Sequence, residues 1–568
     1  QSLKVKTPIG YYRKWVPEFP KVFPYPFQTI QASAHPAFDP LTHEFFAVNF
    51  TKTFFTMFFY EKFSKRMVTH RKKIHEKLTT HLQKIKEEDH PDKIAAVNDF
   101  YKNIDDHIYE RNTIWDKILH FFRKVSSLFV MIFFIVGDWI YGKKNGTFIL
   151  RWKDNEVQRW KIVDAKTGKP VIIDQCMHQN NLSKDYLVLS DAAFKFSADI
   201  LLTNPFPHDQ KMDRFLRELT AIPQMPETPL YIIKRSDLNA NSTTVKAHKI
   251  VIDLELVHFS MNYENPNGKI TLHTAHNAAA CAAEWIRPYD ELVLEREEGI
   301  YENTIGLMAY GEMDIGRIGK FLVDAEKGEI IKREKIYLTG SEGGAENKGA
   351  HTWGIALHTF RDIISSTKVV DEVKQVYWQS YGTDPRFLTK FIEGLYQDYE
   401  HRIIPVAELI EKNREQVPFC LLRQDTSTMS VPDFYLFQFN ENLRSLQFIP
   451  RDRRGQDTTD IDLSMDGYIF CTMVNGTDDL NLDEYTREVW IFDAADLKTG
   501  PICKLSHPDM NYAFTIHSTW MENCKSQVSP YQVNIREDYQ YSINRYAFKK
   551  RAFYSDFMEK YVYPHFDS

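Results

Sequence analysis

The sequence predicts an all-β fold, on two observations. Short runs of aromatic and β-branched residues recur along the chain between turn sequences, and they do not alternate regularly with helical segments. Aromatic residues, which favour strands, make up 14% of the chain and can fill the core of such a fold. The pattern suits a barrel, a sandwich or a propeller, and no fixed repeat selects among them. The expected strands are Phe45–Phe50, Gly146–Trp152, Tyr186–Leu189, Lys249–Leu256, Gly319–Val323, Gly467–Val474 and Glu488–Phe492.

Residues 51–144 break this strand pattern. They contain almost no glycine or proline until the end, which predicts helices. A Phe-rich run, Phe54–Tyr60, and an apolar run, Leu128–Val136, border a highly charged stretch. The second run has basic flanks and is much shorter than the roughly 20 residues of a membrane-spanning helix. We expect a helical insertion that lies on a membrane interface or contacts partner subunits, with a hairpin packed on its own domain as the alternative.

This insertion divides the chain into two parts. Residues 1–50 and 145–568 are expected to form the β domain, and 51–144 the insertion. Pro385–Ile403 and Val406–Arg414 read as helices in the C-terminal half and predict a helical cap. Thr339–Gly349 is rich in glycine but lacks a Gly-Lys-Ser/Thr ending, which indicates a loop rather than a phosphate site.

Composition excludes several classes of protein. The chain has 71 Lys+Arg against 77 Asp+Glu, and this net charge of −6 argues against nucleic-acid binding, which needs a basic excess. Its six cysteines form no C-x-x-C pair, so neither a zinc ribbon nor a disulfide framework is indicated. We expect reduced thiols and an intracellular, membrane-associated protein whose organelle the sequence does not indicate.

Four histidines at strand edges or turns stand in distinctive local patterns. Taken singly, each is more often a hydrogen-bonded structural residue than a metal ligand. The patterns are Ser33-Ala34-His35-Pro36-Ala37-Phe38-Asp39-Pro40-Leu41-Thr42, Met177-His178-Gln179, Val257-His258-Phe259-Ser260-Met261-Asn262-Tyr263-Glu264 and Phe514-Thr515-Ile516-His517-Ser518-Thr519-Trp520.

Taken together and in this order, the four segments resemble the iron-binding segments of the carotenoid cleavage oxygenase family. The stretch from Met465 to Trp520 follows the family's closing blade almost continuously, including Asp493-Ala494-Ala495-Asp496-Leu497. The resemblance implies a seven-bladed β-propeller in which His35, His178, His258 and His517 bind Fe(2+).

The resemblance also implies a function. The chain is expected to be a non-haem iron(II) dioxygenase that uses dioxygen to cleave a double bond of a carotenoid-like or apocarotenoid-like apolar polyene. Neutral imidazoles suit this role because they bind ferrous iron and leave positions open.

The sequence departs from the family pattern near these histidines. Gln179 stands where the family has Asp, and Ser518 where it has Gly. The family also orients three of its histidines with glutamates, and Ser445 stands at one of these glutamate positions. Only 34 residues precede His35, fewer than in the family, so the first blades are expected to be cleaved off, supplied by another chain or missing.

These departures leave alternatives open. The main one is a catalytically degenerate propeller that serves as a structural subunit of a membrane-associated complex. Retinoid-type isomerisation or ester cleavage is a weaker third option. His273 and His276 are competing ligands, but their spacing of three would place them on opposite faces of a strand, so they rank second.

Overall fold

The computed structural model describes the following parts of the chain: 31–53, 56, 136, 144–154, 156–192, 210–211, 213–214, 217, 223–280, 284–296, 299–309, 311–340, 349–361, 369–476, 485–510, 512, 515–521, 535–544 and 548–565. The chain divides into two compact units. One comprises Gln1–Thr51, Gly146–Lys195 and Gln224–Ser568, and the other Lys52–Asn145 with Phe196–Pro223. The predicted insertion, 51–144, lies almost entirely outside the described residues, and its helical character stays a prediction. The strands and helices bounded below all belong to the first unit.

The first part of this unit is a nine-stranded sheet. Its strand order is β1-β3-β4-β5-β9-β8-β7-β6, with β2 paired to β3, and all pairs are antiparallel except β5 with β9. Within it, β6 to β9 form a four-stranded meander. The strands are β1 (Gln31–Ala32), β2 (Ala37–Asp39), β3 (Glu44–Thr51), β4 (Gly146–Lys153), β5 (Glu156–Asp164), β6 (Cys176–Leu182), β7 (Tyr186–Ala192), β8 (Thr228–Lys234) and β9 (Thr244–Ile252).

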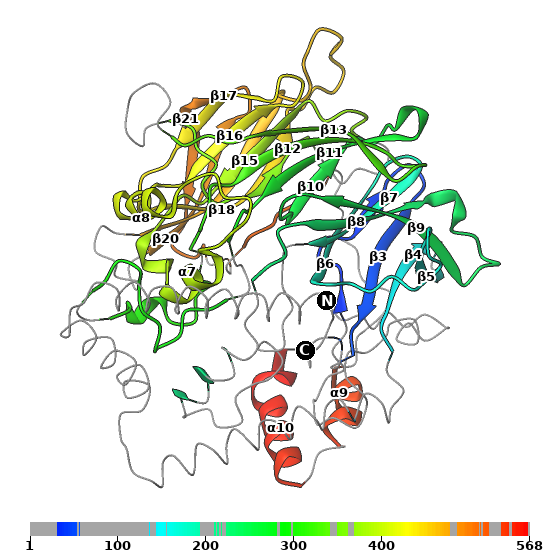
Figure 1. The fold of residues 1–568 in the computed structure, drawn as a ribbon, viewed down its shortest axis with the longest axis horizontal. Helices are drawn as coiled ribbons and strands as arrows, with labels where there is room; N and C mark the ends of the chain where they lie inside the picture. The colour runs from blue at the N-terminus through cyan, green and yellow to red at the C-terminus, as the bar shows by residue number, and fades with distance from the viewer. Residues whose placement is uncertain are drawn as a thin grey trace, which may run out of the picture. The chain divides into compact units, whose positions relative to one another are not determined.

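Three four-stranded antiparallel meanders follow (Figure 1). In each, strands adjacent in sequence are adjacent in the sheet. The first contains β10 (His258–Met261), β11 (Lys269–His276), β12 (Arg317–Asp324) and β13 (Glu329–Ile336); the second contains β14 (Ile355–Thr359), β15 (Gln375–Ser380), β16 (Cys420–Asp425) and β17 (Ser430–Leu436); the third contains β18 (Glu441–Pro450), β19 (Gly467–Gly476), β20 (Tyr485–Asp493) and β21 (Asp496–Ser506).

The last strand of each meander is its most exposed strand. All four residues of β10 are buried, β12 is buried at most alternate positions, and β13 is largely exposed and charged. An inner strand is apolar because neighbouring sheets cover both of its faces, whereas charges on an outer edge discourage pairing with another chain. The meanders are therefore ordered from a buried inner strand to a solvated outer one.

Hydrophobic clusters fill the spaces between successive sheets. Ile232 of β8 packs in one cluster with Phe259 and Phe321, and Trp378 of β15 packs in another with Ile318 of β12. The first strands of the meanders are neighbours, because β6 contacts β10, β10 contacts β14, and β14 contacts β18. The molecule is thus mostly β, as predicted, with sheets that succeed one another as propeller blades do.

Helices are few in the described part of the first unit. They are α7 (Lys390–Tyr396), α8 (Val406–Glu415), α9 (Ile535–Ile543) and α10 (Phe548–Tyr561), with 3₁₀ turns at Arg235–Asp237, Pro266–Gly268, Glu302–Thr304, Pro385–Phe387 and Tyr563–His565. The prediction of one helix over Pro385–Ile403 was wrong, since only α7 is helical within it besides one 3₁₀ turn. α7 ends at Tyr396, whose carbonyl accepts a hydrogen bond from the Arg402 guanidinium at 2.6 Å, and further along the Asp314 carboxylate accepts hydrogen bonds from the backbone N–H groups of Ile403 and Ile404 at 3.0 and 2.9 Å.

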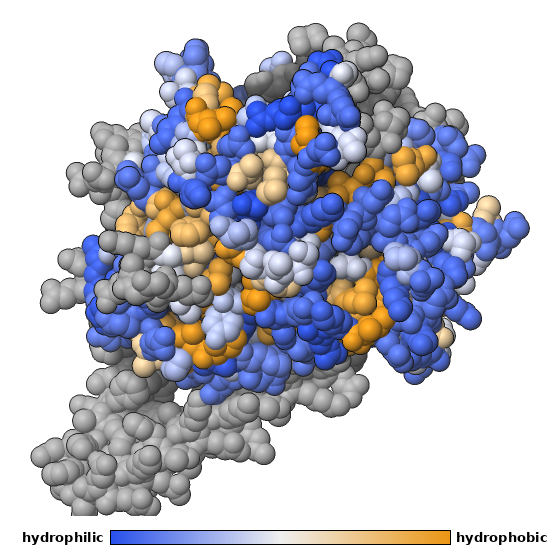
Figure 2. Space-filling view, turned by 90° about the horizontal axis from the view of Figure 1, so that it is seen from above, coloured by the Kyte–Doolittle hydropathy of each residue, from blue (hydrophilic) through white to orange (hydrophobic). Residues whose placement is uncertain are grey.

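The surface is mixed in polarity. On the face drawn in Figure 2, hydrophilic side chains predominate and hydrophobic ones gather in separate patches. Among the described residues, no helix is both long and apolar enough to cross a membrane. The predicted membrane contact falls in residues 51–144 and stays a prediction.

Candidate metal centre

Each of the four predicted histidines is placed by a different element of the first unit. His178 is the third residue of β6, His258 the first of β10, and His35 lies just before β2. His517 lies in the described segment 515–521, beyond β21. The first strands of two successive meanders therefore contribute one histidine each, and segments from near the two ends of the unit contribute the others.

Backbone hydrogen bonds fix His35 against His178. The N–H groups of Ala34 and His35 both donate to the carbonyl of His178, at 2.8 and 3.1 Å, and the N–H of Asn180 donates to the carbonyl of His35 at 3.1 Å. The His35 segment thus forms a short parallel bridge with β6. This pairing holds His35 and His178 next to each other, although they lie 143 positions apart in the sequence.

Three imidazole nitrogens converge. Nε2 of His258 lies 3.1 Å from Nε2 of His178 and 3.2 Å from Nε2 of His35. Together these three residues form a group whose possible ligand atoms all lie within 4.8 Å of one another. The ring of His517 packs on the same group, with its centroid 4.4 Å from that of His35 and 5.0 Å from that of His258, although its nitrogens lie outside the group of three.

The distances between these nitrogens fit a shared metal ion. Two imidazole nitrogens bound to one first-row metal at about 2.0–2.1 Å lie roughly 2.9 Å apart in octahedral and roughly 3.3 Å apart in tetrahedral geometry. The observed 3.1 and 3.2 Å fall between these values. An all-imidazole donor set suits iron, zinc, copper or nickel better than calcium or magnesium.

The tautomer of His258 also suits metal binding. Its Nδ1 lies 3.1 Å from the carbonyl oxygen of Ala356 in β14, and a carbonyl can only accept, so Nδ1 carries the proton. The lone pair of Nε2 therefore points into the histidine group. A backbone carbonyl performs here the orienting role that carboxylates often have at metal sites.

Burial keeps these imidazoles neutral. Burial, reinforced by the nearby His178 and His517, lowers the pKa of His35 to about 2. Burial and then His517 lower the pKa of His178 to about 4, and burial holds the pKa of His258 well below its usual value. The rings are therefore neutral near pH 7, which is the form that binds metals.

The competing histidines lie elsewhere. Nε2 of His273 lies 3.1 Å from the side-chain oxygen of Asn262, and the ring of His276 lies between Thr274 and the carbonyl of Glu255. Neither belongs to the group of three. Another possible metal group among the described residues is Glu227, Glu400 and His401, but its side chains are partly or fully exposed.

Ser445, at a position where the family has an orienting glutamate, does not serve that role. Its hydroxyl lies 2.7 Å from the hydroxyl of Thr472 on the neighbouring strand β19. Ser445 does not line the large cavity beside the histidines, whereas Gln447, two residues further along β18, does. The Ser445 side chain therefore makes a hydrogen bond within the sheet and does not orient a histidine.

Sequence reasoning missed His358. It lies on β14, lines the same cavity as His35, His258 and His517, and has its ring centroid 6.4 Å from that of His258. A single histidine in the apolar run Ile355–Phe360 was the only signal, and such a residue is usually structural.

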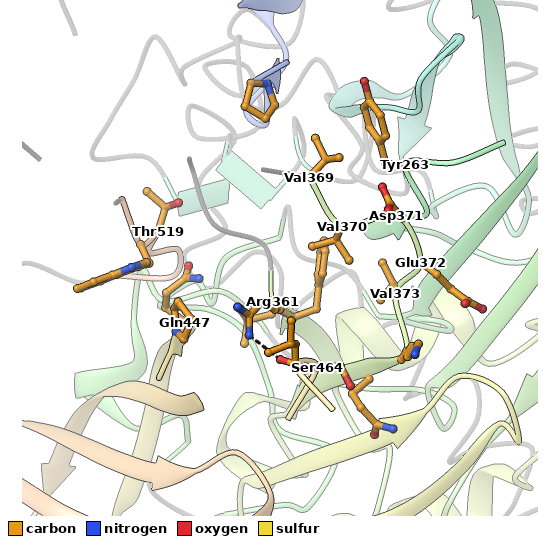
Figure 3. Close-up of a pocket in the computed structure, with 18 of the residues that line it drawn as sticks. Tyr263, Arg361, Val369, Val370, Asp371, Glu372, Val373, Gln447, Ser464 and Thr519 are labelled. Atoms are coloured by element: carbon orange, nitrogen blue, oxygen red, sulfur yellow. Dashed lines mark hydrogen bonds between the residues drawn. The ribbon is translucent and has the colours of Figure 1, made fainter. Parts of the chain in front are cut away.

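His35, His258, His358 and His517 line a cavity of about 2060 Å³. Its lining mixes apolar residues such as Phe38, Phe360 and Trp520 with charged ones. Figure 3 shows residues 369–373 along one side and Gln447 and Thr519 on the other. The volume is ample for an elongated organic molecule.

Comparisons with known proteins give limited information. No family model matches the chain, and no curated protein matches it. A lignostilbene dioxygenase from Pseudomonas brassicacearum is similar in structure, with 12% sequence identity and a TM-score of 0.35 over 66% of this chain and 59% of its own. An α-L-arabinofuranosidase from Fusarium graminearum matches with 7% identity and a TM-score of 0.24, over 66% of this chain and 75% of its own. This chain thus spans 59% of the dioxygenase it matches, and likenesses this low carry no argument about function.

Proposed function

We propose that this chain is a divergent carotenoid cleavage oxygenase, built as a seven-bladed β-propeller, that binds Fe(2+) through His35, His178, His258 and His517. Its reaction would split a carbon–carbon double bond of a carotenoid-like or apocarotenoid-like polyene. One molecule of dioxygen supplies both oxygen atoms of the two carbonyl products. The observation that carries the proposal is the convergence of three histidine Nε2 atoms at a cavity.

The iron, when bound, would supply the position at which dioxygen is bound and activated, while the electrons that reduce dioxygen come from the double bond that is cleaved. The chain's own residues would orient the histidines and provide the surface that binds the substrate. The Ala356 carbonyl holds His258 in the tautomer whose Nε2 faces the group, and the backbone bridge between His35 and β6 holds the neighbouring ring in place. Phe360 and Val370 line the cavity with apolar surface against which a hydrocarbon chain can lie.

The experiment is metal analysis of the untagged protein, purified without a histidine tag and reconstituted with ferrous iron without oxygen. About one iron per chain is expected. The His258→Ala variant should retain almost none, whereas the control His507→Ala, which removes an exposed histidine that does not line the cavity, should retain it all. Full iron content in His258→Ala would refute the proposed ligand set.

A second candidate is a propeller without catalytic activity, kept as a structural subunit. The hydrogen bond of Ser445 to Thr472 favours it, because the glutamate that orients a histidine in the family is absent at this position. This candidate predicts no stoichiometric iron and firm co-purification with other chains. A monomeric, iron-loaded protein that cleaves a polyene would exclude it.

We also propose that residues 51–144 attach the protein to a membrane interface or to partner subunits. The support is the sequence pattern of two Phe-rich or apolar runs around a charged stretch. Sedimentation with anionic vesicles, compared between the full chain and a variant with charged residues in place of Phe133 and Phe134, tests the membrane alternative.

A further inference from the structure

His358 occupies a place in its sheet like that of the predicted ligands. It lies on β14, the first strand of its meander, as His178 lies on β6 and His258 on β10. These strands are neighbours in the fold. His258 and His358, from successive inner strands, therefore line one cavity, and His178 belongs to the histidine group beside it.

His358 is nevertheless not one of the converging nitrogens. The group within 4.8 Å comprises His35, His178 and His258 alone, and the His358 ring centroid is 6.4 Å from that of His258. This places the ring beside the candidate metal site, at a distance where it can reach a molecule bound there rather than the ion.

Neighbouring rings fix the orientation of His358. Its centroid lies 4.8 Å from that of Trp378, which is fully buried, and its plane is stacked on Phe360 at 6.4 Å with an interplanar angle of 5°. Among the residues that the structure describes, none makes a hydrogen bond with the ring nitrogens of His358. The imidazole is thus held firmly at the cavity wall with its polar atoms available to a ligand.

A neutral imidazole has one donor and one acceptor. An apolar ligand that covered these atoms would leave them without partners, at a cost of about 1–3 kcal/mol, whereas a hydroxyl or carbonyl oxygen would satisfy one of them. The rest of the cavity is compatible with such a ligand, since Gln447 and Asp371 also line it (Figure 3).

We propose that His358 is a substrate-positioning residue that hydrogen-bonds a hydroxyl or carbonyl oxygen of the substrate beside the histidine group. The substrate is accordingly an oxygen-bearing stilbene or apocarotenoid rather than a plain hydrocarbon. This inference rests on the proposed function, because it takes the cavity as the substrate site.

The test compares the binding of 4-hydroxystilbene and unsubstituted stilbene to the metal-free full chain by equilibrium dialysis. Wild type should bind the hydroxylated compound more tightly by about tenfold, the effect of one neutral hydrogen bond. His358→Phe, which keeps a ring between Trp378 and Phe360, should lose this preference while binding stilbene at least as well. His358→Gln, which keeps a donor and an acceptor, should retain most of it.

Several outcomes would overturn the inference. One is that wild type binds the two compounds equally or binds neither. Another is that His358→Phe keeps the preference for 4-hydroxystilbene unchanged. His358→Met is the second apolar variant in case the phenylalanine is not accommodated. Loss of iron from a folded His358→Phe or His358→Met variant would also overturn it, because His358 would then be a ligand. A wild type that shows the preference but takes up no iron when reconstituted with ferrous iron would refute the proposed iron chemistry but not the role of His358.

Discussion

The side-chain amide of Gln179 hydrogen-bonds both backbone groups of Phe259: Nε2 donates to the carbonyl at 2.7 Å, and Oε1 accepts from the N–H at 2.9 Å. Gln179 follows His178 on β6, and Phe259 follows His258 on β10. The amide therefore joins the two strands next to the histidines they present. An ionised aspartate at this position would be shorter and could not donate, so it could not make both hydrogen bonds.

Changing Gln179 should weaken metal binding without removing any ligand. In Gln179→Glu the carboxylate faces the Phe259 carbonyl and the donated hydrogen bond is lost. We expect metal affinity to fall about 10- to 100-fold, the usual effect of disturbing groups that orient ligands. Competition with a chelator measures it. Gln447→Glu, a matched change elsewhere on the cavity wall, should have a smaller effect, and equal losses in both variants would contradict the assignment.

The turn that carries His35 depends on a buried ion pair. Arg235 lies 2.6 Å from Asp39 and 2.8 Å from Glu44, and the Asp39 side chain is completely buried. Asp39→Asn should lower the free energy of unfolding at pH 7 by about 3 kcal/mol, the lower end of the range for breaking a buried pair. Urea denaturation measures it. Glu334→Gln, in the exposed pair with Lys332, should cost less than about 1 kcal/mol.

The effect of Asp39→Asn should also depend on pH. Burial opposes ionisation of Asp39, but the hydrogen bond and charge of Arg235 outweigh it and hold the pKa below its usual value. A group with a depressed pKa stabilises the fold above its unfolded pKa, about 3.9, and this contribution is lost as pH falls through the folded pKa. The difference between wild type and variant should therefore shrink below about pH 4. A difference that grew on acidification would contradict the ion-pair assignment.

Buried histidines outside the candidate metal centre should make the protein sensitive to mild acid. Burial lowers the pKa of His276 to about 3 and that of His351 to about 4. Because the unfolded chain takes up these protons from about pH 6.5 downward, stability is full above that pH and falls toward the folded pKa values, by up to about 1.4 kcal/mol per pH unit for each group. The urea midpoint at pH 7, 6 and 5 checks this. His351→Gln should make the decline shallower, and an unchanged slope would contradict the expectation.

The described cysteines should differ in reactivity. Burial raises the pKa of the Cys420 thiol to about 12 and also raises that of Cys471, whereas Cys503 is only partly buried. Since the thiolate is the reactive form, Cys503 should be alkylated by iodoacetamide in the native protein while Cys420 and Cys471 are modified only after unfolding. Peptide mass spectrometry resolves the three sites. Rapid native labelling of Cys471 would be inconsistent with its buried position in β19.

Local sequence was sufficient for many strands but not for their tertiary connections. Predicted strands such as Phe45–Phe50 and Gly467–Val474 lie within β3 and β19, because aromatic and β-branched runs between turns specify strands locally. The helix predicted over Pro385–Ile403 ends at Tyr396, and the backbone N–H groups of Ile403 and Ile404 donate to the carboxylate of Asp314, far away in sequence. Distant contacts of this kind leave no local pattern.

The same distinction applies to the site. The four histidines were selected by resemblance to a family, and the structure brings three of their nitrogens together with the fourth ring beside them. The Ala356 carbonyl that orients His258 has no sequence signature, because any residue supplies a carbonyl. His358 was missed because its importance lies in the neighbouring strands rather than in its own segment.

The contact between the rings of His35 and His517 has a consequence for how the protein is made. Ribosomal synthesis proceeds from the N-terminus, so the His35 segment and the sheets that follow are all synthesised before His517 appears. Such long-range contacts form late, because the intervening chain must first be ordered. The proposed four-histidine centre can therefore form only after His517 has been synthesised, and a truncated chain that ends after β21 would lack the fourth histidine.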